Sequence, residues 1–231
     1  YQMGCDCARI LGIGIPNIYI INDQTLNALT ICTDDIEPLI IIHSGLYERM
    51  TPGELRCVIG HECGHIQNQH GIYDMLKQIL VAAGTSAAGL LSVQLMNLMT
   101  QGVQFLLNAW SRAAEVTCDR AGMICSERVE DAYSVNAKLL YGAAIGDKET
   151  VNLEALKKQL EMQMGTLVRL EELFTDHPAA VRRIMAEMEF ARCEVFYRWR
   201  PELKEAGQSV CTKEETDERC RRYVDVIRKG K

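Results

Sequence analysis

The sequence predicts an α+β fold that is mainly α-helical, with a small β-sheet near the N-terminus. Three observations predict it: short apolar runs rich in β-branched residues come first, a strong helix-start signal follows at Thr51, and helical patterns continue from residue 112 onward. The chain has 231 residues, of which 48% are hydrophobic. It is therefore long enough to bury a substantial core.

The N-terminal part is expected to contain one helix and a small sheet. Residues 3–12 have helical periodicity. Three apolar runs at 15–21, 26–32 and 38–43 are typical of strands, and an acidic turn joins the last two. We expect these three runs to pair with one another.

The clearest helix start in the chain is Thr51-Pro52-Gly53-Glu54. Thr51 suits the N-cap position, Pro52 suits the first helical position, and Glu54 can complete a capping box with Thr51. We expect this helix to continue into the seventies.

Residues 78–111 contain no charged side chain, which raises the question of a membrane span. Polar residues and glycines recur every few positions, so the hydropathy of this segment is too low for lipid. We expect one or two buried helices here, and the alternative is peripheral contact with a membrane. Further helices are expected at 112–126, 127–145, 152–174 and 178–198.

Composition restricts the partners and the compartment. A net charge of −6 argues against nucleic acid as the main partner, because phosphate binding needs a basic face. The ten cysteines have no paired spacing typical of zinc sites. We interpret them as reduced, mostly buried thiols of a cytoplasmic protein. This protein would be membrane-associated if residues 78–111 contact a membrane. No positively charged, apolar leader follows Tyr1, which leaves open whether upstream segments are missing.

We expect two parts in the chain. Residues 1–200 form the main domain, and residues 201–231 form a charged helical extension to which we assign no chemistry. The sequence makes no prediction of the oligomeric state.

The decisive motif is His61-Glu62-Cys63-Gly64-His65, within the helix that starts at Thr51. Positions four apart on a helix lie about 40° from each other around its axis, so His61 and His65 can reach one ion. Neutral imidazoles suit Zn²⁺ with water in a vacant position, and Glu62 stands beside the ion without ligating it. The motif therefore predicts one zinc ion per chain.

A third protein ligand has to come from another segment. His70 lies nine residues after the first histidine, and on a continuous helix it would face about 180° away. Cys32 or Cys118 could supply a thiolate, as in peptide deformylases, but the Glu-Gly-Cys context of those enzymes is missing. Glu115 is the best candidate, because Asp119 follows four residues later on the same helix and can support the first shell of ligands while Glu115 ligates.

The chain resembles a known family of zinc peptidases. The segment HECGH, followed about fifty residues later by SRAAEVTCD, is similar to the gluzincins that include the CAAX prenyl endopeptidases and the HtpX-type heat-shock proteases. The segments LNAL at 26–29 and DHPAAVRRI at 176–184 match the same family, metallopeptidase family forty-eight. The resemblance covers roughly residues 8–190 and implies a zincin-like fold.

The resemblance also implies roles for individual residues. Glu115 would be the third zinc ligand and Asp119 its partner in the second shell. His177 and Arg183 would lie near the scissile group.

Two cysteines depart from the family pattern. Cys63 occupies a position that is usually aliphatic, and Cys118 one that is usually alanine. If these thiols lie near the metal, sensitivity to oxidation is an open question.

His177 can also be interpreted from its own neighbourhood. Pro178 favours a helix that begins there, which places His177 at the N-cap boundary. The positive end of the helix dipole disfavours imidazolium, so a neutral ring that hydrogen-bonds or coordinates is expected. A histidine of this kind, taken alone, is more often a plain surface residue.

The main functional hypothesis is a zinc endopeptidase. Glu62 would take a proton from water during attack and return it to the leaving amine, while His177 steadies the oxyanion. An edge strand would hold extended or unfolded polypeptide by its backbone, through Asn27, Ala28, Leu29 and Thr30. Two alternatives remain open, namely a zinc-stabilised, non-catalytic chaperone-like module and a different zinc hydrolase such as a deformylase.

Overall fold

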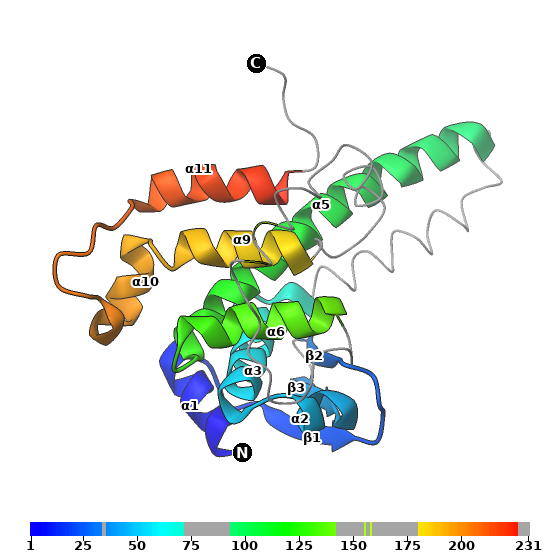
Figure 1. Ribbon diagram of the computed structural model, residues 1–231. Coiled ribbons are helices and arrows are strands. Elements are labelled where there is room, and N and C mark those ends of the chain that lie inside the picture. The colour runs from blue at the N-terminus through cyan, green and yellow to red at the C-terminus, as the bar shows by residue number, and fades with distance from the viewer. Residues whose placement is uncertain (34–35, 72–92, 142–154, 156–157, 159–179, 226–231) are drawn as a thin grey trace.

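A computed structural model describes the chain in the ranges 1–33, 36–71, 93–141 and 180–225, together with residues 155 and 158. The elements in chain order are α1 (Gln2–Leu11), β1 (Asn17–Ile21), β2 (Ala28–Thr33), β3 (Ile36–His43), α2 (Ser44–Arg49), α3 (Pro52–Gln67), α5 (Val93–Cys125), α6 (Val129–Tyr141), α9 (Ala180–Phe190), α10 (Glu194–Trp199), a 3₁₀ turn (Pro201–Leu203) and α11 (Lys213–Val224). Helices dominate and the sheet has three strands, which confirms the prediction of a mainly helical fold with a small N-terminal sheet (Figure 1).

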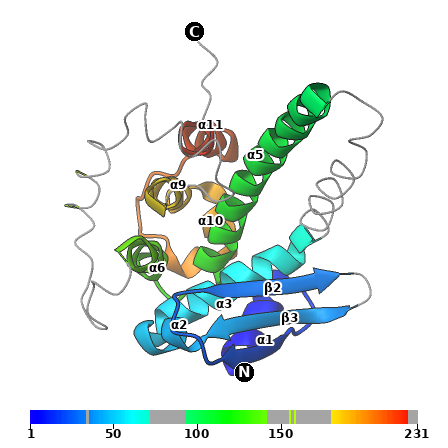
Figure 2. The ribbon, with the colours of Figure 1, turned by 90° about the vertical axis from the view of Figure 1, so that its right-hand side faces the viewer.

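The sheet has the strand order β1-β3-β2, with β1 parallel and β2 antiparallel to β3. The central strand β3 carries the buried Ile40 and Ile42, and α1 and α3 pack behind the sheet (Figure 2). Within the described ranges β2 is an edge strand, and it lies along α3. The sheet thus places one strand edge beside the helix that carries the His61–His65 motif.

Helix α3 begins where the sequence predicts. The side chain of Thr51 accepts a hydrogen bond from the Glu54 backbone, and the Glu54 side chain accepts one from the Thr51 backbone, so the capping box is confirmed. The helix does not continue into the seventies but ends at Gln67. The Asn68 side chain donates to the carbonyl of Gly64, and Gln69 adopts a left-handed φ of 53°, which turns the chain away from the helix axis.

The other helix boundaries differ from the expected ones in two places. Helix α5 runs unbroken through the expected boundary between 111 and 112, because no proline interrupts the helical pattern there. The expected helix at 178–198 is divided into α9 and α10, because Cys193 leaves the helix and pairs with Cys211 as an isolated bridge. The expected helix at 152–174 and the first half of 78–111 lie mostly outside the described residues.

Helices α3 and α5 approach each other closely through glycines. A Cβ atom on Gly60 would lie 2.6 Å from the Cβ of Cys125, and one on Gly64 would lie 2.9 Å from the Cβ of Ala121. On the other side of the contact, a Cβ on Gly122 would lie 2.9 Å from a carbonyl oxygen of α3. The absence of these three side chains lets the two backbones pack at a distance that larger residues would prevent.

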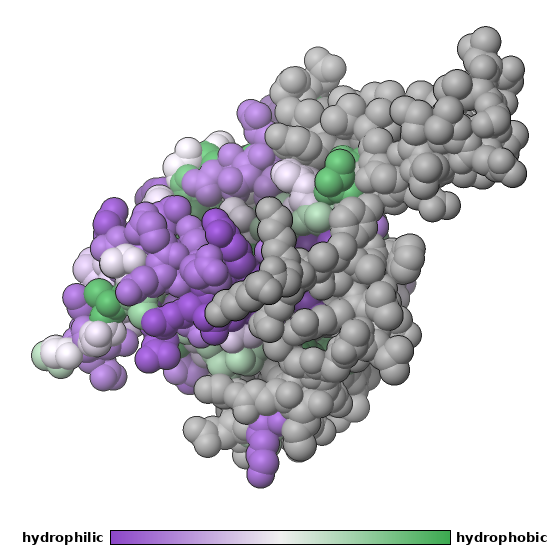
Figure 3. All heavy atoms as spheres, turned by 90° about the horizontal axis from the view of Figure 1, so that it is seen from above, coloured by the Kyte–Doolittle hydropathy of each residue, from purple (hydrophilic) through white to green (hydrophobic). Residues whose placement is uncertain are grey.

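The C-terminal helix packs onto the rest of the described structure. Helix α11 lies against α9 and α5, with an ion pair of 3.0 Å between Arg120 and Asp217. Among the described residues that are visible from this side, hydrophilic ones predominate (Figure 3). Among the described helices, none is both long and apolar enough to cross a bilayer.

A buried ion pair joins α3 to α6. Glu54 and Lys138 are 4% and 3% exposed, and Lys138 Nζ lies 2.8 Å from Glu54 Oε2. Burial opposes the ionised form of Glu54, but Lys138, Ser134 and the Thr51 backbone outweigh it and lower the pKa of this carboxyl. The pair therefore stabilises the fold above the ordinary pKa of glutamate and loses this effect as the pH falls through the lower, folded-state value.

Replacing Lys138 by methionine should lower the free energy of unfolding by about 3 kcal/mol at neutral pH, because Glu54 is left buried without its partner. Urea denaturation measures this, and the difference from the unmodified chain should shrink as Glu54 becomes protonated in acid. Lys213→Met removes an exposed pair and should change the free energy by less than about 0.5 kcal/mol. Equal losses for the two variants would contradict the prediction.

Candidate metal centre

Three potential ligand atoms from α3 and α5 lie close together. His61 Nε2 is 3.2 Å from His65 Nε2, and the carboxylate oxygens of Glu115 lie 3.5 and 3.6 Å from these two nitrogens. In a tetrahedral zinc site with bonds of about 2.1 Å, neighbouring ligand atoms are about 3.4 Å apart. The chemistry and the spacing of the three groups therefore fit one zinc ion.

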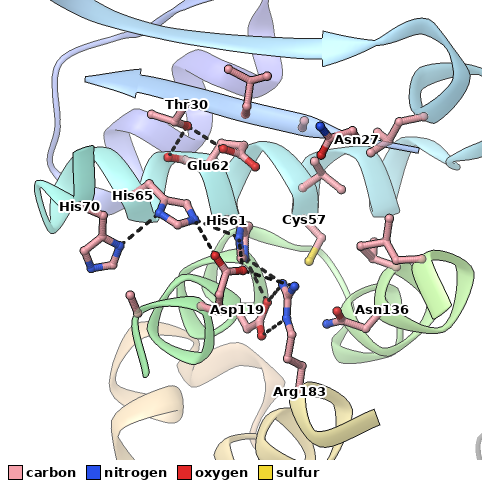
Figure 4. A pocket seen from close by; sticks show the side chains of 18 of the residues that line it. Asn27, Thr30, Cys57, His61, Glu62, His65, His70, Asp119, Asn136 and Arg183 are labelled. Carbon is pink, nitrogen blue, oxygen red and sulfur yellow. Dashed lines mark hydrogen bonds and ion pairs between the residues drawn. The ribbon is translucent and has the colours of Figure 1, made fainter. Parts of the chain in front are cut away.

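Asp119 and Arg183 stand behind these groups. Asp119 Oδ1 lies 3.0 Å from His61 Nδ1, so a proton on Nδ1 would be donated to Asp119 and Nε2 would keep its lone pair for a metal. Arg183 binds both oxygens of Asp119, and its Nη1 lies 3.3 Å from Glu115 Oε2 (Figure 4). Burial opposes the ionised form of Asp119, but Arg183 outweighs it and lowers the pKa of this carboxyl.

The electrostatics favour a cation at His61. Burial disfavours imidazolium, yet Asp119 and Glu115 outweigh it and raise the pKa of His61 to about 10. At His65, burial and the neighbouring His61 outweigh the effect of Glu115 and lower the pKa to about 3. The site thus favours a positive charge at His61 and a neutral ring at His65. A metal ion bound to both rings could supply this positive charge in place of the proton.

Glu62 is held from the side of the sheet. Its side chain is buried, and the hydroxyl of Thr30 donates to Glu62 Oε2 at 2.6 Å. Burial raises the pKa of Glu62, and the bond from Thr30 acts in the opposite direction. In Figure 4, Thr30 and Glu62 lie on one side of His61 and His65, with Asp119 and Arg183 on the other.

These side chains line one pocket of about 470 Å³. One wall is formed by the start of β2 and the residue before it, and it contains the residues predicted to hold substrate, namely Asn27, Ala28, Leu29 and Thr30. The Thr30 hydroxyl also donates a hydrogen bond to Glu62 Oε2. The structure thus brings the edge strand and the motif helix to the same cavity.

His70 does not face away from the motif as expected. Because α3 ends at Gln67, the chain turns back and His70 Nδ1 lies 3.1 Å from His65 Nδ1. The expected direction of His70, on the far side of α3 from the motif, is therefore wrong. His70 still stands outside the group formed by His61, His65 and Glu115.

The remaining predicted residues have different positions. His177 and Pro178 lie outside the described residues. Cys118 Sγ lies 3.4 Å from His70 Nδ1, whereas Cys63 is fully buried within the hydrophobic core. All ten cysteines are described, and none forms a disulfide.

Glu187 and Asn136 also line the pocket, and neither was singled out from the sequence. Glu187 is 2% exposed, accepts a hydrogen bond of 2.8 Å from Asn136, and has its pKa raised by burial. The available signal was its position four residues after Arg183, which places both on one face of α9. For Asn136 we find no signal in the sequence.

Comparisons with known proteins show what the chain is similar to. The sequence profile described as Peptidase family M48 matches residues 2–189. The chain is 31% identical to the plastoglobule-localized metallopeptidase 48 of Arabidopsis thaliana, over 67% of this chain and 43% of that protein. It is 34% identical to a Protease HtpX homolog of Levilactobacillus brevis, over 37% of this chain and 28% of that protein.

The chain spans less than half the length of these relatives. No solved structure matches it.

Replacing Asp119 by asparagine should lower the zinc affinity about 10- to 100-fold, because His61 loses the carboxylate that fixes its orientation. Competition with a chelating dye measures the affinity. Asp217→Asn is the matched control, since Asp217 also pairs with an arginine but lies on α11, and it should leave zinc binding unchanged. Equal affinities for the two variants would show that Asp119 does not support the metal ligands.

Proposed function

The chain belongs to peptidase family M48, and from this premise we propose that it is a zinc-dependent endopeptidase that cleaves extended or unfolded polypeptides. Metallopeptidases of this family depend on zinc. The family and the named relatives together support the assignment of this chain as a metallopeptidase. One observation carries the finer proposal: the nitrogens of His61 and His65 and the carboxylate of Glu115 converge in the pocket that Glu62 also lines.

In this proposal His61, His65 and Glu115 hold the ion. Zinc, when bound, lowers the pKa of water and polarises a carbonyl group. Asp119 keeps His61 in the tautomer whose Nε2 can coordinate, and its bonds to Arg183 hold it in place. Arg183 is therefore a positioning residue, since it already binds two carboxylates.

Glu62 moves the proton. Its carboxylate would accept a proton from the attacking water and deliver it to the nitrogen of the leaving amine. Burial raises the pKa of Glu62, and a carboxyl with a raised pKa is better suited to hold the proton and pass it on. The hydroxyl of Thr30 fixes one carboxylate oxygen and leaves the other for this transfer.

The substrate would lie along β2. An extended segment can add to an edge strand through backbone hydrogen bonds, which recognise any sequence of residues. Residues 27–29 lie on the wall of the pocket beside the candidate metal ligands and are suited to this pairing. His177 as the group that steadies the oxyanion, and peripheral membrane contact through 78–111, remain predictions.

Replacing Glu62 by glutamine should leave zinc binding intact and lower casein cleavage by about a hundredfold or more, because the amide cannot accept the proton. Zinc content and cleavage are measured on the same sample. Glu205→Gln changes an exposed glutamate and should behave like the unmodified chain. Equal digestion by the Glu62 variant would refute the proposal, and zinc binding with no cleavage by either protein would favour the chaperone-like module.

Replacing Thr30 by valine should lower kcat by about 10- to 100-fold with little change in KM, because a hydrogen bond to a charged group contributes about 1.5–3 kcal/mol. Steady-state kinetics on a fluorogenic peptide separate the two constants. Thr30→Ser keeps the hydroxyl and should restore most of the rate. If serine were no better than valine, the hydroxyl would have no part in holding Glu62.

A further inference from the structure

A second group of ligand atoms lies beside the candidate metal centre, and we propose that it binds a second Zn²⁺ ion that shares His65 with the first. His65 presents Nε2 to His61 and Glu115, while its Nδ1 faces His70. A ring nitrogen of His65, a ring nitrogen of His70 and Sγ of Cys118 all lie within 4.8 Å of one another. The proposal rests on the proposed zinc site for the shared ligand but requires no peptidase turnover.

Two of the three distances among these atoms are close to those of a zinc site, and the third, between His65 and Cys118, is at most 4.8 Å. His70 Nδ1 lies 3.1 Å from His65 Nδ1 and 3.4 Å from Cys118 Sγ. In a tetrahedral zinc site, two nitrogens are about 3.4 Å apart and a nitrogen and a sulfur about 3.6 Å. One thiolate and two imidazoles form a ligand set that zinc accepts readily, and water can fill the fourth position.

The backbone brings His70 into this position at a cost. Gln69 adopts a φ of 53°, a left-handed conformation that is strained for a residue with a side chain. The ring of His70 then packs edge-on against Trp110 of α5, with 5.2 Å between the ring centroids, and is almost fully buried. The turn after α3 and the contact from α5 therefore hold a histidine rigidly beside His65 and Cys118, as a metal site requires.

Charge balance and access are also satisfied. On binding, Cys118 would lose its thiol proton and His65 its Nδ1 proton, and both protons go to solvent, so that two negative ligands offset the dipositive ion. The ion can enter from the pocket, which reaches His65, His70 and Trp110. Two cations that share one imidazole repel each other, so the second ion binds more weakly and each ion lowers the affinity for the other.

Cobalt titration of the metal-free Glu62→Gln variant tests the proposal without self-digestion. We expect two equivalents of Co²⁺ to bind, and a thiolate-to-cobalt charge-transfer band to appear only with the second. Cys118→Ala in the same background should bind one equivalent and lack the band. Cys63→Ala, which removes an equally buried thiol on α3, should still bind two and keep the band.

A single equivalent without the band, or a band that persists in a folded Cys118→Ala variant, would overturn the proposal. If Cys118→Ala does not fold, the stoichiometry and the band of the Glu62→Gln variant alone decide. The peptidase assignment is judged separately by casein cleavage. Metal counting is independent of cleavage, so failure of one proposal is distinguishable from failure of the other.

Discussion

The close contact between α3 and α5 is the constraint on which the rest of the site depends. Gly60, Gly64 and Gly122 remove the side chains that would hold the two backbones apart. Glu115 on α5 then reaches the imidazoles that α3 presents one turn apart. A wider spacing would leave the motif helix with two potential ligands, which is one fewer than a catalytic zinc site normally takes from the protein.

The charged side chains around this contact are buried, and they therefore need opposite charges close by. Two buried carboxylates, Glu115 and Asp119, would be costly without positive charge nearby, and Arg183 on α9 supplies part of it. The remaining negative potential acts on His61, whose pKa is raised to about 10. Helix α9 therefore matters to the site although it carries none of the three candidate ligands, and its packing on α5 links the fold to the chemistry.

Signals within one segment of the sequence were sufficient to predict an interaction wherever that segment carries all the interacting groups. The capping box of Thr51 and Glu54 and the shared face of His61 and His65 depend on positions three or four apart, and the periodicity of a helix determines those relations. Longer-range details were not predictable in this way. The contact of Thr30 with Glu62 joins a strand to a helix, and its register depends on how β2 lies along α3.

The class of fold, the motif helix and the candidate zinc ligands could be predicted from the sequence, because they depend on composition and on spacing within single elements. The position of His70 could not be predicted and depends on how the chain folds after α3. A capping bond from Asn68 and one left-handed residue, Gln69, reversed the direction inferred from a continuous helix. The meeting of His65, His70 and Cys118 likewise depends on two helices packed together, and no spacing along one chain segment encodes that distance.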